Sequence, residues 1–534
     1  MCVARRHYTI VYHCGGSCEK RIFVSNPARV GEQARGRYIV GMAARLVEII
    51  EHFGSPKIVL VGDFMIDRYV FGSTERVSPE APIPVLRFTR EETRLGGAGF
   101  VLAGLATLGA CVSCVGVCGR DSAGDKLLET LSTYPHTNTS GVVRCERPTV
   151  EKMRFLGSSE DRAAQQMLRL DIEQTTPVDD LTQDALYTAV ELALDAAQVL
   201  CLEDYNKGVL TDALTRRLIT LAKSKNIPVL VDPARLSDYS KYAGATLIKL
   251  NRPETEKATG LKITDLASCH TAAATLIEKL DLHGVVITMN DKGSYLATRD
   301  GDARLLASRP RQVADATGAG DMVLTALVMS RAAGADWHEA VEIANVVGGL
   351  EVERLGCVPI TRAQIIADLL HEHRTTAGKQ RTLETLLPEV DALRRSGRRI
   401  VFTNGCFDLI HLGHVKYFQF AKAQGDVLVV GVNTDASIRR LKGEKRPVVN
   451  EDDRCGVLEE LESIDYLVKF DTDTPLELIQ SIGPDVLVKG ADYAKEQVVG
   501  WDVVEARGGH VALAPLIDGR STSNVIQRIL EAYQ

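Results

Sequence analysis

The sequence predicts an α/β chain with two domains, each built on a parallel sheet. Its length of 534 residues exceeds what one hydrophobic core usually organises. Short runs of branched apolar residues alternate with helical patterns, which is typical of a parallel sheet covered by helices on both faces. This alternation pauses over a polar stretch at residues 371–397 and then begins again. We therefore expect a larger three-layer domain followed by a smaller one.

The elements of the first domain start shortly after residue 55. Residues 57–62 are expected to form its first strand, because the run Lys-Ile-Val-Leu-Val-Gly is short, apolar and rich in β-branched residues. The first domain is expected to span residues 56–370. Its other clear elements are strands at 228–232 and 285–288 and helices at 212–225 and 272–280.

A second series of strands and helices closes the chain. Its strands are expected at residues 399–403, 427–431 and 486–489. The smaller domain is therefore expected to span residues 398–534, with residues 371–397 as the linker.

The first 55 residues show no clear periodicity. They lack the continuous apolar core and the cleavage pattern of a secretory signal. We expect a disordered extension over residues 1–55; a start codon assigned too early and a targeting role are the alternatives.

Composition narrows the class of protein. Apolar residues make up 45% of the chain and charged residues 25%, the mix of a soluble globular protein. The net charge of −7 implies no basic surface overall, so nucleic acid is not expected as a partner. No apolar run reaches about 18 residues, so no membrane insertion is expected. The twelve cysteines lie scattered through apolar segments and indicate the reduced thiols of a cytoplasmic protein.

The sharpest motif of the first half is Asp315-Ala-Thr-Gly-Ala-Gly-Asp321, which precedes an apolar helical pattern. The small residues Gly318, Ala319 and Gly320 let the backbone approach a ligand. Their N–H groups at a helix N-terminus form an anion hole for a phosphoryl group. Asp321 can take the proton from an attacking hydroxyl. A glycine turn with an aspartate N-cap is the plain structural alternative.

This motif and its surroundings resemble the ribokinase-like (PfkB) sugar kinases over residues 56–365. The resemblance implies that Asp67, Gly96 and Gly97 lie on the sugar side. It also implies that an Asn-x-x-Glu element organises magnesium and the phosphates, with Glu254 holding the metal indirectly. The residues expected around ATP are Asn251, Arg252, Pro253, Glu254, Thr288, Gly293 and Asn345.

Further stretches at residues 78–84, 165–166 and 204–208 are similar to the kinase part of the bifunctional heptose 7-phosphate kinase and heptose 1-phosphate adenylyltransferase family. A substrate that carries a phosphate needs cations. The candidates are Lys152, Arg154 and Arg169, each with solvent-facing charge as the alternative, and Asp204 is expected beside the sugar.

Two departures from the family pattern affect the sugar site. The chain has Phe100 where the family usually has asparagine, and phenylalanine makes no equivalent hydrogen bonds. It also reads Asp232-Pro-Ala-Arg235 where the relatives tend to have lysine after proline. Either the sugar pocket is rearranged or the kinase half is weakened.

The second half opens with Thr403-Asn-Gly-Cys-Phe-Asp-Leu-Ile-His-Leu-Gly-His414. His411 and His414 are three residues apart, so on the first turn of a helix they face one way. Two imidazoles can donate hydrogen bonds to an α-phosphate whose charge grows as pyrophosphate leaves. A zinc pair is the chemical alternative, without further ligands at suitable spacing, and a pair of solvated surface histidines is the structural one.

This string resembles the His-x-Gly-His signature of the cytidylyltransferase-like nucleotidyltransferases over residues 398–534. The resemblance implies a Rossmann-like domain. The residues that it places around the nucleotide are Asn404, Gly405, Phe407, Lys442, Arg454, Ser521 and Thr522.

Joined in one chain, the two resemblances imply consecutive reactions. ATP with Mg²⁺ would phosphorylate D-glycero-β-D-manno-heptose 7-phosphate at C1, and adenylyl transfer from ATP would then give ADP-heptose for lipopolysaccharide core. The resemblance also implies a homodimer. A kinase for another sugar phosphate fused to a cytidylyltransferase, or a non-catalytic binding or regulatory protein, are the alternatives.

Overall fold

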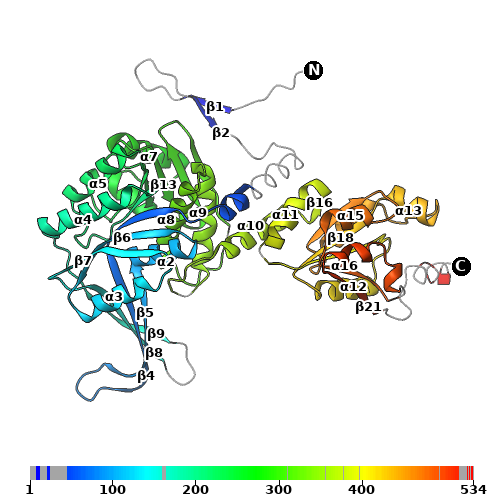
Figure 1. Cartoon of the computed structure of the whole chain (residues 1–534), viewed down its shortest axis with the longest axis horizontal. Helices are drawn as coiled ribbons and strands as arrows, with labels where there is room; N and C mark the ends of the chain where they lie inside the picture. Colours follow the sequence, from blue (N-terminus) through cyan, green and yellow to red (C-terminus); the bar gives the residue numbers. More distant parts are fainter. Residues whose placement is uncertain are drawn as a thin grey trace. The chain divides into compact units, whose positions relative to one another are not determined.

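The structure is a computed structural model and describes residues 8–11, 21–24, 45–158, 164–309, 311–354, 356–376, 378–395, 397–491, 494–515, 526, 528 and 531–532 (Figure 1). The chain divides into two compact units. The first takes residues 1–24 and 48–365, and the second takes residues 25–47 and 366–534.

A nine-stranded sheet forms the centre of the first unit, in the order β15-β14-β13-β12-β11-β10-β3-β6-β7. Neighbours from β7 to β13 are parallel, and β14 and β15 are added antiparallel at one edge. Three strands of this sheet confirm strands that the sequence predicts. The strands are β3 (Lys57–Gly62), β6 (Cys111–Gly119), β7 (Thr137–Cys145), β10 (Val199–Glu203), β11 (Val229–Asp232), β12 (Leu247–Asn251), β13 (Gly284–Thr288), β14 (Ser294–Thr298) and β15 (Ala303–Leu306). In this order β3, β11 and β13 correspond to the strands predicted at 57–62, 228–232 and 285–288.

Helices cover both faces of this sheet (Figure 1). On one face, α4 (Asp180–Leu194), α5 (Asp212–Ser224) and α7 (Leu266–Lys279) share a buried apolar cluster with Val59 and Val61 of β3. Side chains alternate along a strand, so Ile58 and Leu60 face the other layer. That layer holds α2 (Ala98–Thr107), α8 (Ala319–Ala332) and α9 (Trp337–Val352), which pack on one another. The expected three-layer arrangement is confirmed.

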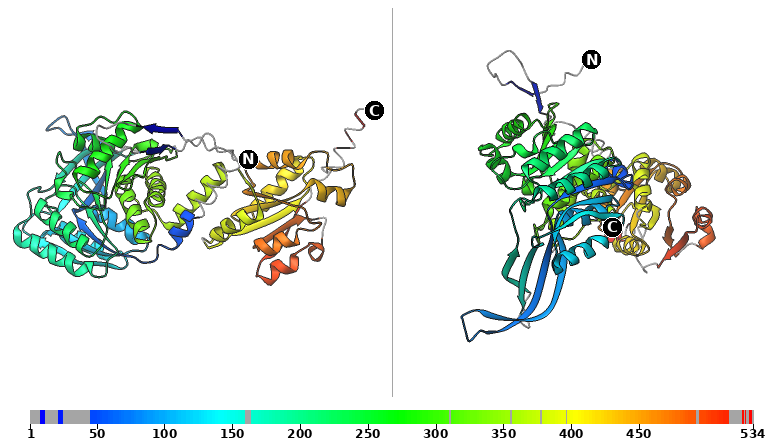
Figure 2. Two further views of the ribbon diagram at one scale, coloured as in Figure 1. Left: turned by 90° about the horizontal axis from the view of Figure 1, so that it is seen from above. Right: turned by 60° about the vertical axis from the view of Figure 1, so that its left-hand side comes forward.

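A smaller four-stranded sheet extends from the first unit (Figure 2). Its order is β5-β4-β8-β9, and three of its pairings are β4–β5 antiparallel, β4–β8 parallel and β8–β9 antiparallel. Its strands are β4 (Phe64–Val77), β5 (Pro84–Gly97), β8 (Val150–Ser158) and β9 (Gln165–Ile172). The N-terminal end of β4 directly follows β3, so this sheet begins at the edge where the central strands end.

The second unit contains a six-stranded parallel sheet in the order β16-β19-β18-β17-β20-β21. This is the expected Rossmann-like alternation of strands and helices. The strands are β16 (Gln380–Arg381), β17 (Ile400–Gly405), β18 (Val427–Asn433), β19 (Tyr466–Phe470), β20 (Val486–Gly490) and β21 (His510–Ala514). The helices include α12 (Leu412–Lys422), α13 (Asp435–Lys442) and α14 (Glu451–Glu459).

The stretch expected to be a linker is instead largely folded. Strand β16 pairs with β19, and α11 (Leu383–Arg395) buries Leu386, Val390 and Leu393. Arg381 and Glu389 form a buried ion pair at 2.8 Å. The apolar residues of α11 recur every three or four positions, but many charged residues lie between them, so the segment looks polar as a whole.

The N-terminal stretch also differs from its expectation. Residues 45–51 form a helix, and Leu46, Ile49, Ile50 and the following Phe53 are buried. Residues 8–11 and 21–24 form the antiparallel pair β1 and β2. Short elements of this kind carry too few residues to show a period.

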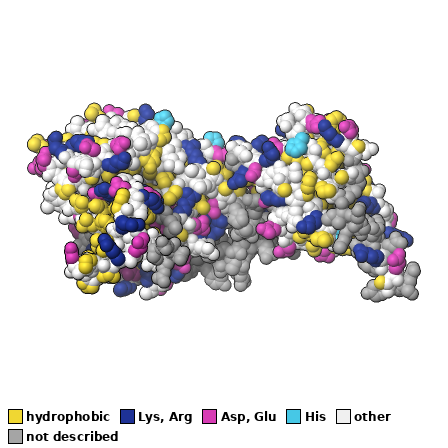
Figure 3. All heavy atoms as spheres, turned by 90° about the horizontal axis from the view of Figure 1, so that it is seen from below, with side chains coloured by type: hydrophobic (Ala, Val, Ile, Leu, Met, Phe, Trp, Pro, Cys, Tyr) yellow, Lys and Arg dark blue, Asp and Glu magenta, His cyan; other side chains and the backbone are white. Residues whose placement is uncertain are grey.

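In the part of the chain that the structure describes, no helix is long and apolar enough to cross a membrane. On the face drawn in Figure 3, lysine and arginine side chains are interspersed with aspartate and glutamate. This mixture agrees with the modest negative net charge of −7.

Candidate active sites

Asp321 lies in the first turn of α8 and is 7% exposed. The Tyr205 hydroxyl donates a hydrogen bond to its Oδ1 at 2.9 Å. Burial, and then the charge of Asp232, raises the pKa of Asp321 to about 7. A carboxyl group with a pKa near neutrality suits a general base.

The predicted anion hole is the N-terminus of α8. Gly318 is the N-cap, and its φ of 95° lies in the left-handed region that favours glycine. Upstream, Asp315 fixes the turn by accepting hydrogen bonds from Thr317 N at 2.9 Å and Gly356 N at 3.1 Å. The N–H groups of residues 318–320 are therefore held at a positive helix end, as anion binding requires.

Phe100 packs against this turn. Its side chain is 2% exposed, and a Cβ at Gly318 would lie 2.6 Å from its ring. Glu351, whose burial raises its pKa to about 8, lies on the same side of Gly318. At position 100 the chain therefore places a buried aromatic ring, beside the equally buried Glu351, against the turn predicted to bind phosphate.

The predicted sugar side is assembled on β4, β5 and β8. Asp67 is buried and forms an ion pair with Arg154 at 2.5 Å. A Cβ at Gly96 would lie 2.6 Å from Asp67 Oδ2, so this glycine leaves room for the carboxylate. Lys152 lies 5.1 Å from the ring of Tyr205, the residue bonded to Asp321. Two of the three predicted cations therefore lie near the predicted sugar-binding aspartate and the base.

Asp204, predicted beside the sugar, and Arg169, a candidate cation for the substrate phosphate, pair with other residues instead. Asp204 is enclosed by an ion pair with Lys241 at 2.6 Å and a hydrogen bond from the Tyr242 hydroxyl at 2.7 Å. These partners occupy its carboxylate, so the structure does not present it to a sugar. Arg169 pairs with Asp171 at 2.9 Å on the exposed strand β9, as its solvent-facing alternative proposed.

The predicted ATP side lies at the ends of β12 and β13. Asn251 and Glu254 form the capping box of α6 (Arg252–Thr259), which begins with Arg252 and Pro253. Asn251 is the register partner of Thr288 on the next strand. One oxygen of Glu254 accepts from Asn251 N at 2.9 Å, and carboxylate oxygens are ligands that Mg²⁺ favours.

Two further predicted ATP-side residues hold the edge strands. Asn345 of α9 accepts a hydrogen bond from the Ser294 hydroxyl at 2.6 Å and donates one to Leu306 O at 2.8 Å. Gly293 has φ 94°, and a Cβ there would lie 2.1 Å from the same carbonyl oxygen of Leu306. Both residues shape the wall formed by β14 and β15.

Asp321 is part of an acidic cluster that the sequence analysis does not predict. Oxygens of Glu203, Asp232 and Asp321 lie within 4.8 Å of one another. Glu203 ends β10 and Asp232 ends β11, so the parallel sheet brings them to one edge. Burial, and then Asp232, raises the pKa of Glu203 well above its usual range. The cluster includes a cation of its own, because Lys249 of β12 forms an ion pair with Asp232.

In the second unit, the structure brings the two histidines together. His411 is the N-cap of α12 and His414 lies in its first turn. Their rings stack with centroids 4.0 Å apart. Burial, and then His411 and Lys442, lowers the pKa of His414 to about 4, so this imidazole is neutral at pH 7. Only two imidazoles meet, and no acidic or thiol ligand joins them in a metal-binding group among the described residues.

The predicted residues before the histidines shape the turn. Phe407 has φ 48°, is 6% exposed and packs on Phe418 at 5.0 Å between ring centroids. A Cβ at Gly405 would lie 2.9 Å from the Phe407 ring. Asn404 is the last residue but one of β17, and its carbonyl accepts a hydrogen bond from Lys489 at 3.2 Å. Phe407 therefore serves as a packing anchor.

Arg454 is not placed for nucleotide contact. It is 1% exposed and donates to Val449 O, Cys406 O and Asn433 O at 2.5–3.1 Å. Its guanidinium also pairs with Asp435 at 2.8 Å. These bonds use its donors inside the unit, so the predicted nucleotide contact is not supported. The predictions for Ser521 and Thr522 lie outside the described residues.

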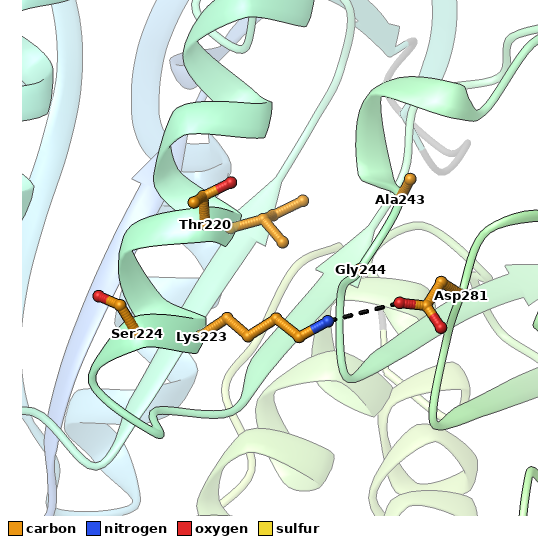
Figure 4. A pocket seen from close by; sticks show the side chains of 7 residues that line it. Thr220, Lys223, Ser224, Ala243, Gly244 and Asp281 are labelled. Atoms are coloured by element: carbon orange, nitrogen blue, oxygen red, sulfur yellow. Dashed lines mark hydrogen bonds and ion pairs between the residues drawn. The ribbon is translucent and has the colours of Figure 1, made fainter.

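One surface hollow lies on the first unit, away from the predicted site residues (Figure 4). It is lined by α5 and by the loops at Gly244 and Asp281. The exposed pair Lys223–Asp281, at 3.4 Å, spans it. No predicted catalytic or binding residue lines it.

Comparisons with known proteins match both units. A family model described as pfkB family carbohydrate kinase matches residues 55–363, and one described as Cytidylyltransferase-like matches residues 402–516. Among solved structures, Arabidopsis thaliana ribokinase complexed with ribose and ATP is 20% identical, with 59% of this chain and 99% of that chain covered and a TM-score of 0.47.

Three curated relatives share the name "Bifunctional protein HldE". The protein from Syntrophotalea carbinolica is 43% identical, covering 89% of this chain and 96% of the relative. The one from Geobacter metallireducens is 44% identical with the same coverage, and the one from Geobacter sulfurreducens is 43% identical, covering 91% and 98%.

These matches confirm the fold class and the two enzymatic parts that the motifs predict, a carbohydrate kinase followed by a nucleotidyltransferase. They also support the expected heptose phosphate kinase and adenylyltransferase function. The chain belongs to the family of bifunctional HldE proteins.

Proposed function

We propose that the first unit phosphorylates the C1 hydroxyl of D-glycero-β-D-manno-heptose 7-phosphate with Asp321 as the general base. The observation that carries this role is the buried carboxyl of Asp321, with a pKa of about 7, at the N-terminus of α8. Asp321 takes the proton as the C1 oxygen bonds to the γ-phosphorus of ATP and the bond to the departing ADP breaks. The N–H groups of residues 318–320 stabilise the charge of the transferring group.

The sugar and the nucleotide approach this centre from different strands. Asp67, oriented by Arg154, accepts hydrogen bonds from sugar hydroxyls, and Lys152 adds positive charge for the phosphate of the substrate. Glu254 would hold Mg²⁺ indirectly beside Asn251. When bound there, the ion would neutralise phosphate charge during transfer.

The second unit would join heptose 1-phosphate to AMP. An oxygen of the sugar phosphate attacks the α-phosphorus of ATP, and the bond to pyrophosphate breaks. His411 and His414 donate hydrogen bonds to the α-phosphate as its charge grows, and Lys442, which acts electrostatically on His414, lies on the phosphate side. No covalent enzyme intermediate is required.

A coupled assay tests both steps. The full chain is incubated with ATP, Mg²⁺ and heptose 7-phosphate, and the products are followed by mass. We expect heptose 1,7-bisphosphate and ADP from heptose 7-phosphate and, in a parallel incubation with heptose 1-phosphate in its place, pyrophosphate and ADP-heptose. Pyrophosphate release from heptose 1-phosphate without kinase turnover on heptose 7-phosphate would contradict the proposed sugar for the first unit.

The pH dependence of the kinase provides a separate prediction. A base acts only when it is ionised, so kcat/KM for the sugar should fall about tenfold per pH unit below pH 7 and level off above it. ADP release measured across this range at saturating ATP checks the slope. A rate that stays level between about pH 5 and pH 8 would contradict Asp321 as the base.

We also propose a homodimer formed through the four-stranded sheet. Strand β9 exposes Leu168 (59%) and Leu170 (46%), and β5 exposes Phe88 (61%). Exposed apolar groups that one small sheet carries mark an interaction surface. We expect L168E to be a monomer by light scattering and L192E, changed at an exposed leucine of α4, to stay a dimer like the wild type. A monomeric wild type would contradict the proposal.

The compartment follows from the same chemistry. The nine cysteines of the described residues are free thiols, and both reactions consume ATP. We therefore place the enzyme in the reducing cytoplasm.

A further inference from the structure

Lys249 is a buried cation that none of the sequence motifs marks. It lies on β12 and is 5% exposed, although burying an ammonium group is costly unless it is paired. Its partner is Asp232 at the end of β11. Burial opposes its charge, but Asp232, with smaller contributions from Glu203 and Asp321, raises the pKa of Lys249 above its ordinary value, so the group stays an ammonium at neutral pH.

The ammonium group also reaches the phosphate-binding turn. A Cβ added to Gly320 would lie 2.9 Å from Lys249 Nζ and 3.9 Å from Asp232 Oδ2. Gly320 therefore leaves room for the lysine beneath the first turn of α8. Asp321, the next residue, belongs to the same carboxylate cluster as Asp232.

We propose that Lys249 is a positioning residue for the kinase reaction, whose ammonium neutralises Asp232 and so keeps Asp321 available as a carboxylate. This role rests on the proposed function of Asp321 as the base. Lys249 acts through the charge of the cluster and does not touch the sugar.

The balance of charge in the cluster supports this role. Three carboxyl groups meet where little solvent reaches them, since Glu203 and Asp321 are buried and the Asp232 side chain is 13% exposed, and like charges oppose ionisation. Among the charged neighbours of Asp321, Asp232 raises its pKa the most and Lys249 lowers its pKa the most. Burial, and then Asp232, raises the pKa of Glu203 well above its usual range, and its buried Oε2 has no hydrogen-bond partner among the described residues. Without Lys249, Asp232 would be an unpaired negative charge beside the base.

Other titratable groups also face Asp321, and they remain in place in K249M, D232N and K249R. They are Lys152 from β8, Glu203 from β10, Tyr205 from the loop after β10, Glu351 from α9 and Cys357 from the loop after α9.

Removing either charge of the Lys249–Asp232 pair should shift the pH profile of the kinase, in opposite directions for the two residues. The full chain is assayed for kinase kcat/KM against pH, with heptose 7-phosphate at saturating ATP. The acidic limb is the part of this profile in which kcat/KM rises with pH. In K249M it should move to higher pH by about one unit or more, since the positive charge that favours the carboxylate of Asp321 is lost. In D232N it should move to lower pH, since the opposing charge is lost and Lys249 remains. K249R should restore a limb close to that of the wild type.

E203Q is the matched control within the cluster. It keeps the shape of a protonated glutamate, so the limb should stay where the wild type has it. Adenylyl transfer from heptose 1-phosphate and the thermal unfolding curve report whether each variant is folded. If K249M does not fold, the direction of the D232N shift decides.

A general loss of activity, with the limb unmoved in K249M and D232N, would overturn the proposal and reduce the pair to a structural one. That result differs from a failure of the proposed function. In the latter case the wild type itself would not phosphorylate heptose 7-phosphate, or its profile would show no acidic limb.

Discussion

Replacing Asp321 by asparagine is expected to lower the kinase kcat by about 10²- to 10⁴-fold. Asparagine has nearly the same size and can still accept the hydrogen bond that the Tyr205 hydroxyl donates, so the turn should keep its shape. It cannot take the proton of the C1 hydroxyl. ADP release with heptose 7-phosphate measures the loss.

The second unit of the same chain is the internal control for D321N. Pyrophosphate release from heptose 1-phosphate and ATP should be unchanged, because His411 and His414 belong to a separate compact unit. D336N is the matched variant, since asparagine can replace Asp336 as the N-cap of α9. Its kinase rate should equal that of the wild type. More than about a tenth of the activity left in D321N would exclude a general-base role.

Replacing His414 by alanine should reduce adenylyl transfer by about 10²- to 10³-fold, the usual cost of removing one donor to a developing oxyanion. The neighbouring ring of His411, at 4.0 Å between centroids, remains but cannot fill both positions. Pyrophosphate release measures the loss, and ADP formation from heptose 7-phosphate should not change. H510A, an exposed histidine of β21, should behave like the wild type in both assays.

The protonation of His414 adds a pH test to that result. Because its pKa is lowered to about 4, His414 is neutral in the free enzyme and gains its proton only well below pH 6. The pH profile of kcat/KM for ATP in adenylyl transfer should therefore have no inflection near pH 6.5 that depends on His414. The profiles of the wild type and H414A should have the same shape in this range. Such an inflection would mean that His414 acts as an imidazolium ion.

The sequence was most informative where one short segment carries a whole function. The turn at 315–321 and the string at 403–414 each predicted a helix N-terminus, and the structure has both, with Asp321 and His414 in the first turns. The strand at 57–62 was predicted from its apolar run for the same reason, because neighbours in the sequence decide it. The actions of these residues on substrates remain proposals.

Features that depend on distant parts of the chain were missed. Lys249 is a single lysine in an apolar strand, and only the order β12-β11-β10 brings it to Asp232 and Glu203. Asp204 lies in a motif, but Lys241 and Tyr242, far along the chain, occupy its carboxylate. The sequence did not predict that residues 378–395 fold, because strand β16 pairs with β19, which lies more than 80 residues later in the chain.

The bonds of Arg454 affect how variants of the second unit should be interpreted. One guanidinium connects the loop before the histidines at Cys406, the end of β18 at Asn433, the loop at Val449 and the start of α13 at Asp435. A substitution here would disturb these four segments together, because the buried guanidinium makes its bonds inside the unit. In a random mutagenesis screen, position 454 would therefore score with His411 and His414 if those histidines act as proposed, and a thermal unfolding curve would distinguish a loss of structural support from a loss of substrate binding.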